Sequence, residues 1–310
     1  MPLIEQSHYD PPQTKKGYFM KLVSYINGGE AGYGVVAQGA DGPAEEALAI
    51  PVEGDFADQY PSIRAVLEGG VLVQLEDWAK GRDASVHLSK VRFLPPLHDA
   101  EKVLCIGVNY PKRHPVHGDV PQPEFISSFA KTEGSLVGHL EPLEYPPEGP
   151  RDSFDYEGEL VLVFGKGGRH IPKAQVFDHI AGYTIMDDGS VRDWQKHSLQ
   201  AGKNFNASGS CGPWMVTADE IADPSAIKLS TRLNGEEVQS TTVASMIFDI
   251  PSLVNYVSTF LELKPGDILS TGSPEGSGGS RQPQRFLVPG DELEIEWSGI
   301  GTLRNKVAGD

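Results

Sequence analysis

Cysteine is scarce in this chain of 310 residues, which contains two, Cys105 and Cys211. No Cys-x-x-Cys pair or other Cys/His spacing typical of a zinc site occurs. An H-x-x-H pair, His114 and His117, encloses Pro115 and has no third ligand nearby, which argues against zinc there as well. We therefore expect two free, buried thiols in a protein of the reducing cytoplasm.

Positive charge and long apolar runs are also in short supply. The chain has 26 Lys and Arg residues against 43 Asp and Glu residues, which gives a formal net charge of −17. Nucleic acids and anionic membrane surfaces attract clustered positive charge, so neither is an expected partner. No run approaches the roughly 18 apolar residues of a membrane helix, and the polar, proline-rich start does not resemble a secretory signal.

Two common catalytic motifs are missing as well. No Walker A loop and no G-x-S-x-G elbow occur, so neither a P-loop nucleotide site nor a serine hydrolase is supported. The glycine cluster at 276–280 (GSGGS) lacks the strand–turn–helix context of a phosphate loop. We expect it to be a flexible turn.

Glycine and proline are abundant, at 35 and 24 residues, which indicates many turns and a mainly β, α+β fold. No βαβ rhythm occurs, so a doubly wound sheet is not expected. Residues 1–19 are predicted to be an extension, and residues 20–97 a small N-terminal α+β domain. Within that domain, 72–79 (LVQLEDWA) is predicted to continue the β structure. Residues 98–310 are predicted to form the catalytic domain.

A buried strand is predicted over 103–110 (VLCIGVNY), where the second domain opens. It runs into 111–125, a polar segment in which four prolines exclude a long helix. A polar loop directly after a core strand is either a lid over a functional site or a plain surface connection, and both interpretations stay open.

Three acidic residues suggest a metal site. Glu157 and Glu159 stand two apart in a predicted strand, so their side chains share one face. Neighbouring carboxylates on a half-buried face repel each other unless a cation balances them. Asp188, at the end of the next strand-like run, adds a third carboxylate, and an all-oxygen set favours Mg²⁺ or Mn²⁺, with Ca²⁺ less favoured. The alternative is that the glutamates line the solvated face of an antiparallel sheet.

A helix is predicted over 191–200, with Ser190 as its N-cap. Arg192 and Gln195 are three apart, so they share one face of its first turn, next to the third acidic residue. They either cover the metal site or lie on an exposed helix start. With the metal, Arg192 and Lys203 supply the local positive charge that an anionic substrate needs in so acidic a protein.

Taken together, the motifs strongly resemble the fumarylacetoacetate hydrolase family over roughly residues 101–307. The motifs that carry the resemblance are, in chain order, CIGVNY, FAK, DYEGEL, GYTIMDDGSVRDWQ, GKNF, GPW, NGE, MIF, PGDILSTGSPEG and GIGTLRN. The resemblance implies a mixed β-sandwich roll with a small N-terminal β domain, usually assembled as a homodimer.

The resemblance also implies a reaction. Family members bind Mg²⁺ or Mn²⁺ through carboxylates that match Glu157, Glu159 and Asp188. They typically cleave a carbon–carbon bond of an acylpyruvate-type or related diketo acid by hydrolysis, in the breakdown of aromatic compounds or sugars. We therefore expect a metal-dependent hydrolase with a small anionic oxo-acid as its substrate.

Further site residues follow from the same resemblance. The family's catalytic lysine falls at Lys203, and its substrate-contacting arginine and glutamine fall at Arg192 and Gln195. Tyr110, in the NY motif, and Ser273, in place of the usual threonine of TGTP, are expected to contact the substrate as well.

The general base is where this chain departs from the family pattern. Members with hydrolase activity often carry His four residues after the Asn of the NY motif, and Glu three residues later. Here Arg113 takes the first of these places, and His114 and His117 follow. These two histidines are the candidates for the base, with Glu124 farther along the chain.

Two other functions stay open. The protein is alternatively a decarboxylase, an isomerase or tautomerase, or a dehydratase of an oxo-acid, since each of these reactions passes through an enolate that a metal stabilises. A third interpretation is an inert domain in which the acidic residues hold a structural Ca²⁺.

Overall fold

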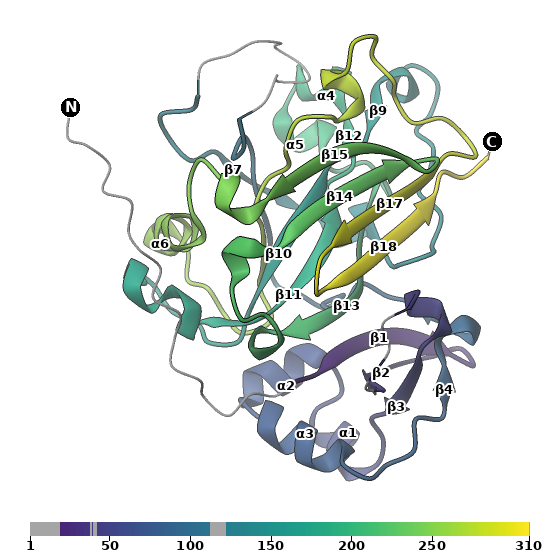
Figure 1. Cartoon of the computed structure of the whole chain (residues 1–310), viewed down its shortest axis with the longest axis vertical. Coiled ribbons are helices and arrows are strands. Elements are labelled where there is room, and N and C mark those ends of the chain that lie inside the picture. The colour runs from purple at the N-terminus through teal and green to yellow at the C-terminus, as the bar shows by residue number, and fades with distance from the viewer. Residues whose placement is uncertain (1–18, 38, 40–41, 112–121, 310) are drawn as a thin grey trace.

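The computed structural model of the protein describes residues 19–37, 39, 42–111 and 122–309. Strands from both halves of the chain join one large mixed sheet (Figure 1). Its spatial order is β4 (Val86–His87), β3 (Leu48–Pro51), β2 (Glu30–Val36), β1 (Lys21–Asn27), β13 (Gly209–Thr217), β11 (Ile180–Asp187), β10 (Gly158–Phe164), β16 (Ile268–Ser270), β6 (Val103–Ile106) and β7 (Ser128–Lys131). Off this path, β5 (Arg92–Phe93) pairs with β1 and β8 (Leu136–Val137) pairs with β13.

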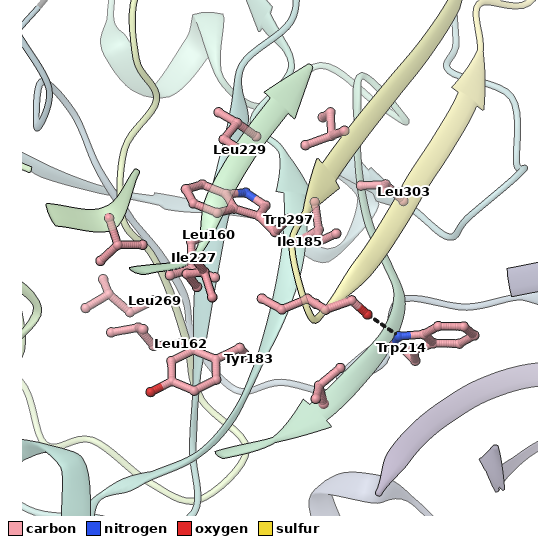
Figure 2. Close-up of a cluster of buried hydrophobic side chains, with 14 of the residues drawn as sticks. Leu160, Leu162, Tyr183, Ile185, Trp214, Ile227, Leu229, Leu269, Trp297 and Leu303 are labelled. Carbon is pink, nitrogen blue, oxygen red and sulfur yellow. Dashed lines mark hydrogen bonds between the residues drawn. The ribbon is translucent and has the colours of Figure 1, made fainter. Parts of the chain in front are cut away.

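A second sheet of four strands packs against the central part of the first (Figure 1). Its order is β15 (Glu236–Thr242), β14 (Lys228–Leu233), β17 (Glu292–Trp297) and β18 (Gly301–Lys306). Buried and more exposed residues alternate along β14 and β17, because one face meets the core and the other meets water. Among the buried side chains that Figure 2 labels are Leu160, Leu162, Ile185, Leu229, Trp297 and Leu303. The predicted mainly β, α+β fold is confirmed.

The N-terminal region continues the large sheet, because β1 pairs antiparallel with β13. Helices α2 (Ile63–Gly69) and α3 (Leu72–Ala79) of this region belong to a second buried cluster. That cluster also contains Val161 and Val163 of β10, whereas Leu160 and Leu162 belong to the core beneath the second sheet. β10 is therefore buried on both faces. The domain limits predicted from the sequence stay predictions.

The β structure predicted over 72–79 is wrong, because this segment is the helix α3. Leu72, Leu75 and Ala79 follow the three- and four-residue spacing that places side chains on one helix face. Leu75 and Ala79 are buried in the N-terminal cluster, and the half-buried Leu72 packs against it. The apolar run at 71–73 gave the misleading signal of a strand.

Figure 1 also labels four further α-helices. They are α1 (Asp55–Gln59), α4 (Arg192–Gln195), α5 (Leu199–Gly202) and α6 (Ile250–Phe260). Asp249 caps α6, since its Oδ1 accepts a hydrogen bond of 2.9 Å from Ser252 N. Among the described residues, no helix is long and apolar enough to cross a membrane.

A buried histidine joins the N-terminal region to the second sheet. His139 Nδ1 accepts a hydrogen bond of 3.0 Å from Arg304 N, and its Nε2 lies 3.3 Å from Glu45 Oε2. An accepting Nδ1 requires a neutral ring with its proton on Nε2. Burial lowers the pKa of His139 to about 4, although Glu45 acts in the opposite direction.

This buried histidine predicts a pH-dependent stability. The unfolded chain protonates His139 near its ordinary pKa of about 6.5, whereas the folded chain does so only at about 4. The stability contributed by the neutral ring is therefore fully present above the unfolded pKa and is lost as the pH falls towards 4. From pH 7 to pH 5, His139→Gln should lose about 2 kcal/mol less unfolding free energy than wild type.

Urea unfolding at the two pH values measures this difference. His87→Gln, which removes an exposed histidine, is the matched control and should follow the wild type. Identical pH dependence of His139→Gln and wild type would contradict the assignment.

Candidate metal centre

The three acidic residues converge at one end of the β10–β11 pair. Glu157 precedes β10, Glu159 lies within it, and Asp188 directly follows β11. The pairing of Gly158 with Asp187 joins the strand ends, and Asp188 N donates a hydrogen bond of 2.9 Å to Glu157 O. All three side chains are buried, and one carboxylate oxygen of each lies within 4.8 Å of the others. The triad could therefore hold a metal ion.

Hydroxyl and amide groups at the end of β16 and directly after it orient two of these carboxylates. Ser273 Oγ donates a hydrogen bond of 2.8 Å to Glu157 Oε1, and Ser270 Oγ donates one to Glu159 Oε2. Gly272 N donates a further bond of 3.0 Å to Glu159 Oε2. Gly272 has a φ of +92°, and a Cβ there would lie 2.8 Å from Asn109 Cβ, so glycine is required. Ser273, predicted to contact substrate, contacts a carboxylate of the triad in this structure.

Two buried lysines, Lys203 and Lys131, contact residues of the triad. Lys203 Nζ donates a hydrogen bond of 2.5 Å to Glu157 Oε2 and another to Asp188 Oδ2. Lys131 Nζ lies 3.1 Å from Asp188 Oδ1 and donates a hydrogen bond of 2.6 Å to Lys203 O. Lys131 was noted only as part of the FAK motif and was not predicted to belong to the site. The other residues of β7 are half-buried or exposed, so no sequence pattern indicated that Lys131 is buried.

The helix predicted over 191–200 is wrong in its extent and in its cap. The segment forms two short helices, α4 and α5, which are separate turns. Ser190 Oγ donates to Asp188 O instead of capping α4. The cap comes from a distant residue, because Ser153 Oγ accepts a hydrogen bond of 3.0 Å from Asp193 N.

Arg192 lies at the first turn of α4 and is buried. Its Nε donates a hydrogen bond of 2.7 Å to Asp155 Oδ2, and its Nη2 lies 3.3 Å from Glu157 Oε1. Its Nη1 lies 3.5 Å from Gln195 Oε1, so the two residues share one face as predicted. Of the two predicted alternatives, the arginine therefore lies beside the triad and not on an exposed helix start.

The buried charges of this site do not balance. The acids are Asp155, Glu157, Glu159, Asp187 and Asp188, and the bases are Lys131, Arg192 and Lys203. Two negative charges remain when all of these groups are ionised. Burial, reinforced by Asp188 and Glu157, raises the pKa of Glu159 to about 8, and burial raises that of Asp187 to about 8.

A bound dication would supply the missing charge. The ligand atoms at hand are carboxylate oxygens, which suit Mg²⁺ or Mn²⁺. Asp188 Oδ1 is buried and accepts no hydrogen bond from the described residues, with Lys131 Nζ as its ionic partner at 3.1 Å. The residues present therefore fit a hard divalent ion held by Glu157, Glu159 and Asp188.

Comparison with known families agrees with this geometry. The model of the fumarylacetoacetate (FAA) hydrolase C-terminal domain matches residues 102–308. The chain belongs to this family. The matched range includes the triad and all three buried cations, and it confirms the resemblance seen in the motifs.

Several curated relatives of this family are named for a tautomerase activity. The mitochondrial oxaloacetate tautomerase Fahd2a of Rattus norvegicus is 41% identical over 222 residues, which cover 71% of this chain and 70% of that protein. The oxaloacetate tautomerase FAHD2A of Homo sapiens is 40% identical over the same shares. An uncharacterized protein of Staphylococcus saprophyticus is 33% identical over 93% of this chain and 99% of its own.

Solved structures of the family share the fold. The 2-hydroxyhepta-2,4-diene-1,7-dioate isomerase of Mycobacterium marinum has a TM-score of 0.72 at 29% identity, over 93% of this chain and 98% of that one. The fumarylacetoacetate hydrolase of Exiguobacterium antarcticum has a TM-score of 0.74 at 29% identity, over 94% of this chain and all of that one. The fold thus accommodates proteins named as isomerase and as hydrolase.

The two candidate bases predicted for this chain, His114 and His117, lie outside the described residues. Tyr110, predicted to contact substrate, is buried, and its hydroxyl has no hydrogen-bond partner among the described residues. Burial raises the pKa of Tyr110, and the negative charge of Glu159 adds to this effect. The Tyr110 hydroxyl therefore keeps its proton near the triad.

The charge excess predicts stabilisation by divalent cations. After treatment with EDTA, added Mg²⁺ or Mn²⁺ should raise the melting temperature, because a ligand that binds the folded state at 100 times its Kd adds about 2.7 kcal/mol. Asp188→Asn removes one ligand charge and should abolish most of this rise. Glu292→Gln, on an exposed strand position, is the control and should keep it. An undiminished rise in Asp188→Asn would exclude the triad as the binding site.

Proposed function

We propose that this protein is a divalent-metal-dependent tautomerase or isomerase of a small oxo-acid, with an oxaloacetate-like diacid as the first candidate substrate. The observation that carries the proposal is a buried carboxylate triad ringed by three cations, in a chain 41% identical to an oxaloacetate tautomerase of Rattus norvegicus. Relatives named as tautomerases and isomerases support this reaction better than carbon–carbon hydrolysis, the function expected first from the sequence.

Keto–enol interconversion moves a proton between carbon and oxygen, and negative charge develops on that oxygen along the way. A divalent cation at the triad would supply a Lewis acid that polarises the oxo group. Burial alone would lower the pKa of Lys203, but Asp188 and Glu157 raise it above its usual value. Lys203 therefore stays protonated and serves as a hydrogen-bond donor to the developing oxyanion, not as a base.

Arg192 is the candidate for binding a substrate carboxylate. Its Nη2 donates no hydrogen bond to the described residues, although it lies 3.3 Å from Glu157 Oε1. A guanidinium group retains its charge at all relevant pH values and matches the geometry of a carboxylate. Gln195 lies next to it and offers an amide for the same substrate group.

Hydrolysis of a diketo acid needs a base that activates water, and tautomerisation needs an acid–base group that moves the carbon-bound proton. The residues predicted for this role, His114 and His117, lie outside the described part of the chain, so the proposal uses neither. Tautomerisation consumes no water. The described residues account for the oxyanion stabilisation that it needs.

The proposal is tested by following the absorbance of enol oxaloacetate with protein and Mg²⁺ or Mn²⁺. We expect faster equilibration of enol and keto forms without release of CO₂. The metal without protein, and the variant Glu159→Gln with metal, are the controls because metal ions alone act on this acid. Pyruvate and CO₂ formed above the metal control would instead indicate a decarboxylase, and cleavage of an acylpyruvate would indicate a hydrolase.

The variant Lys203→Met separates the role of this lysine as an oxyanion donor from the effect of its charge on metal affinity. The variant should lose about 100-fold or more in kcat/KM, as enzymes do when an oxyanion donor is removed. It should also bind Mn²⁺ more tightly, because the acidic cluster loses one positive charge. Steady-state kinetics and calorimetric titration measure the two effects. Lys264→Met, at an exposed position, is the control. Unchanged turnover in Lys203→Met would remove this residue from the mechanism.

A further inference from the structure

Asp155 is a fully buried carboxylate that belongs neither to the metal triad nor to the residues predicted from the sequence. Its Oδ1 accepts hydrogen bonds from Tyr156 N at 2.9 Å and from Gly278 N at 2.6 Å. Its Oδ2 accepts from Gly279 N at 3.0 Å and from Arg192 Nε at 2.7 Å. A carboxylate with four donors is held in one orientation, and bonds to a charged acceptor are the strong ones.

These bonds join three segments that are distant in sequence. β9 (Phe154–Asp155) carries the carboxylate and pairs with β12 (Ser190–Val191), which leads into α4 and Arg192. The third segment is the turn Gly278–Ser280. A Cβ on Gly278 would lie 2.8 Å from Asp155 Oδ1 and 2.2 Å from Arg285 O, so the close approach requires glycine. The glycine cluster predicted as a flexible turn is thus a buried pair of amide donors.

These bonds fix the orientation of the Arg192 guanidinium. Asp155 takes Nε, which fixes the plane of the group and leaves Nη2 near Glu157 Oε1 at 3.3 Å. Without Asp155, the nearest carboxylate would be Glu157, and the arginine would turn onto a metal ligand. Asp155 thereby holds the guanidinium by Nε, so that Arg192 meets the metal-binding Glu157 through Nη2, in an ion pair of 3.3 Å.

We propose that Asp155 is a positioning residue that orients Arg192 towards the substrate carboxylate and ties it to the turn at 278–280. The inference rests on the proposed function in that Arg192 is taken to bind the carboxylate of an oxo-acid. Outer partners of this kind typically change affinity or activity by 10- to 100-fold when they are replaced.

The first test compares Asp155→Asn with wild type in the Mg²⁺-loaded full-length protein. We expect KM for oxaloacetate and the Kd of oxalate, measured by calorimetry, to rise by about 10- to 100-fold with a smaller change in kcat. The double variant Asp155→Asn, Arg192→Lys should be no worse than Arg192→Lys alone, because both changes remove one interaction. Independent, additive losses would overturn the proposal.

Asp267→Asn is the matched control. Asp267 is equally buried and accepts hydrogen bonds from Lys102 N at 3.1 Å and Lys264 N at 2.8 Å. Its carbonyl oxygen bonds Phe164 N, at the far end of β10, roughly 23 Å along the strand from Glu157. This variant should lose stability and keep KM and oxalate affinity within about twofold of wild type. An equal loss in both variants would mean that Asp155 acts on stability alone.

A spectroscopic measurement makes the inference independent of turnover. In NMR spectra of ¹⁵N-labelled protein, the Nε–H signal of Arg192, identified by its loss in Arg192→Lys, should exchange slowly with solvent. In Asp155→Asn it should shift and exchange faster, whereas in Asp267→Asn it should stay unchanged.

Fast exchange of this signal in wild type would overturn the proposal even if Asp155→Asn does not fold. An unaltered signal in folded Asp155→Asn would overturn it as well. If wild type neither tautomerises oxaloacetate nor binds oxalate, the proposed function fails. The Arg192 signal then decides the positioning role alone.

Discussion

The burial of five carboxyl groups beside three cations is the constraint on which the rest of this structure depends. Carboxylates cannot be packed this densely away from water without compensation, because desolvation and mutual repulsion both oppose ionisation. The pKa values of Glu159 and Asp187, raised to about 8, express that cost. A bound dication would offset that cost, so the same charge excess that raises these pKa values favours the binding of a divalent metal.

The fold supplies the rigidity that such a site needs. β10 is buried over its whole length, with one face against the core of the second sheet and the other in the cluster of α2 and α3. Its neighbour β11 leads into Asp188 and its neighbour β16 ends at Ser270, so the hydrogen-bonded ladder sets the spacing of the groups around the triad. Groups carried by paired central strands keep their geometry better than groups on loops.

Function in this family depends on groups around a shared centre. Proteins named as isomerase and as hydrolase have the same fold as this chain, so the fold alone does not select the reaction. The triad and Lys203 suit the step that such reactions share, which is the stabilisation of negative charge on an oxo group. The residues that hold the substrate and those that move its protons then select the reaction. Asp155 belongs to the first group, because it orients the substrate-binding Arg192.

Sequence periodicity predicted the structure correctly where residues close in the chain determine it. It failed where packing against distant segments determines it. The two-residue spacing of Glu157 and Glu159 correctly placed both on the triad side, because strand geometry alone dictates it. The segment 72–79 was misread because a short apolar run fits a strand or a buried helix, and only packing beside α2 resolves the choice. The N-terminal cap of α4 was missed for a related reason, since it comes from Ser153, which lies 40 positions away from Asp193.

By itself, the sequence determined the family, the strand-rich fold and the acidic triad, since each follows from motifs or from the alternation of side chains. Tertiary structure alone decided that Lys131 lies beside Asp188, that Ser273 binds Glu157, and that Asp155 holds Arg192. These contacts join residues 37 to 116 positions apart in the chain. Local patterns constrain only near neighbours, whereas the pairing of buried charges depends on distances that the completed sheet sets.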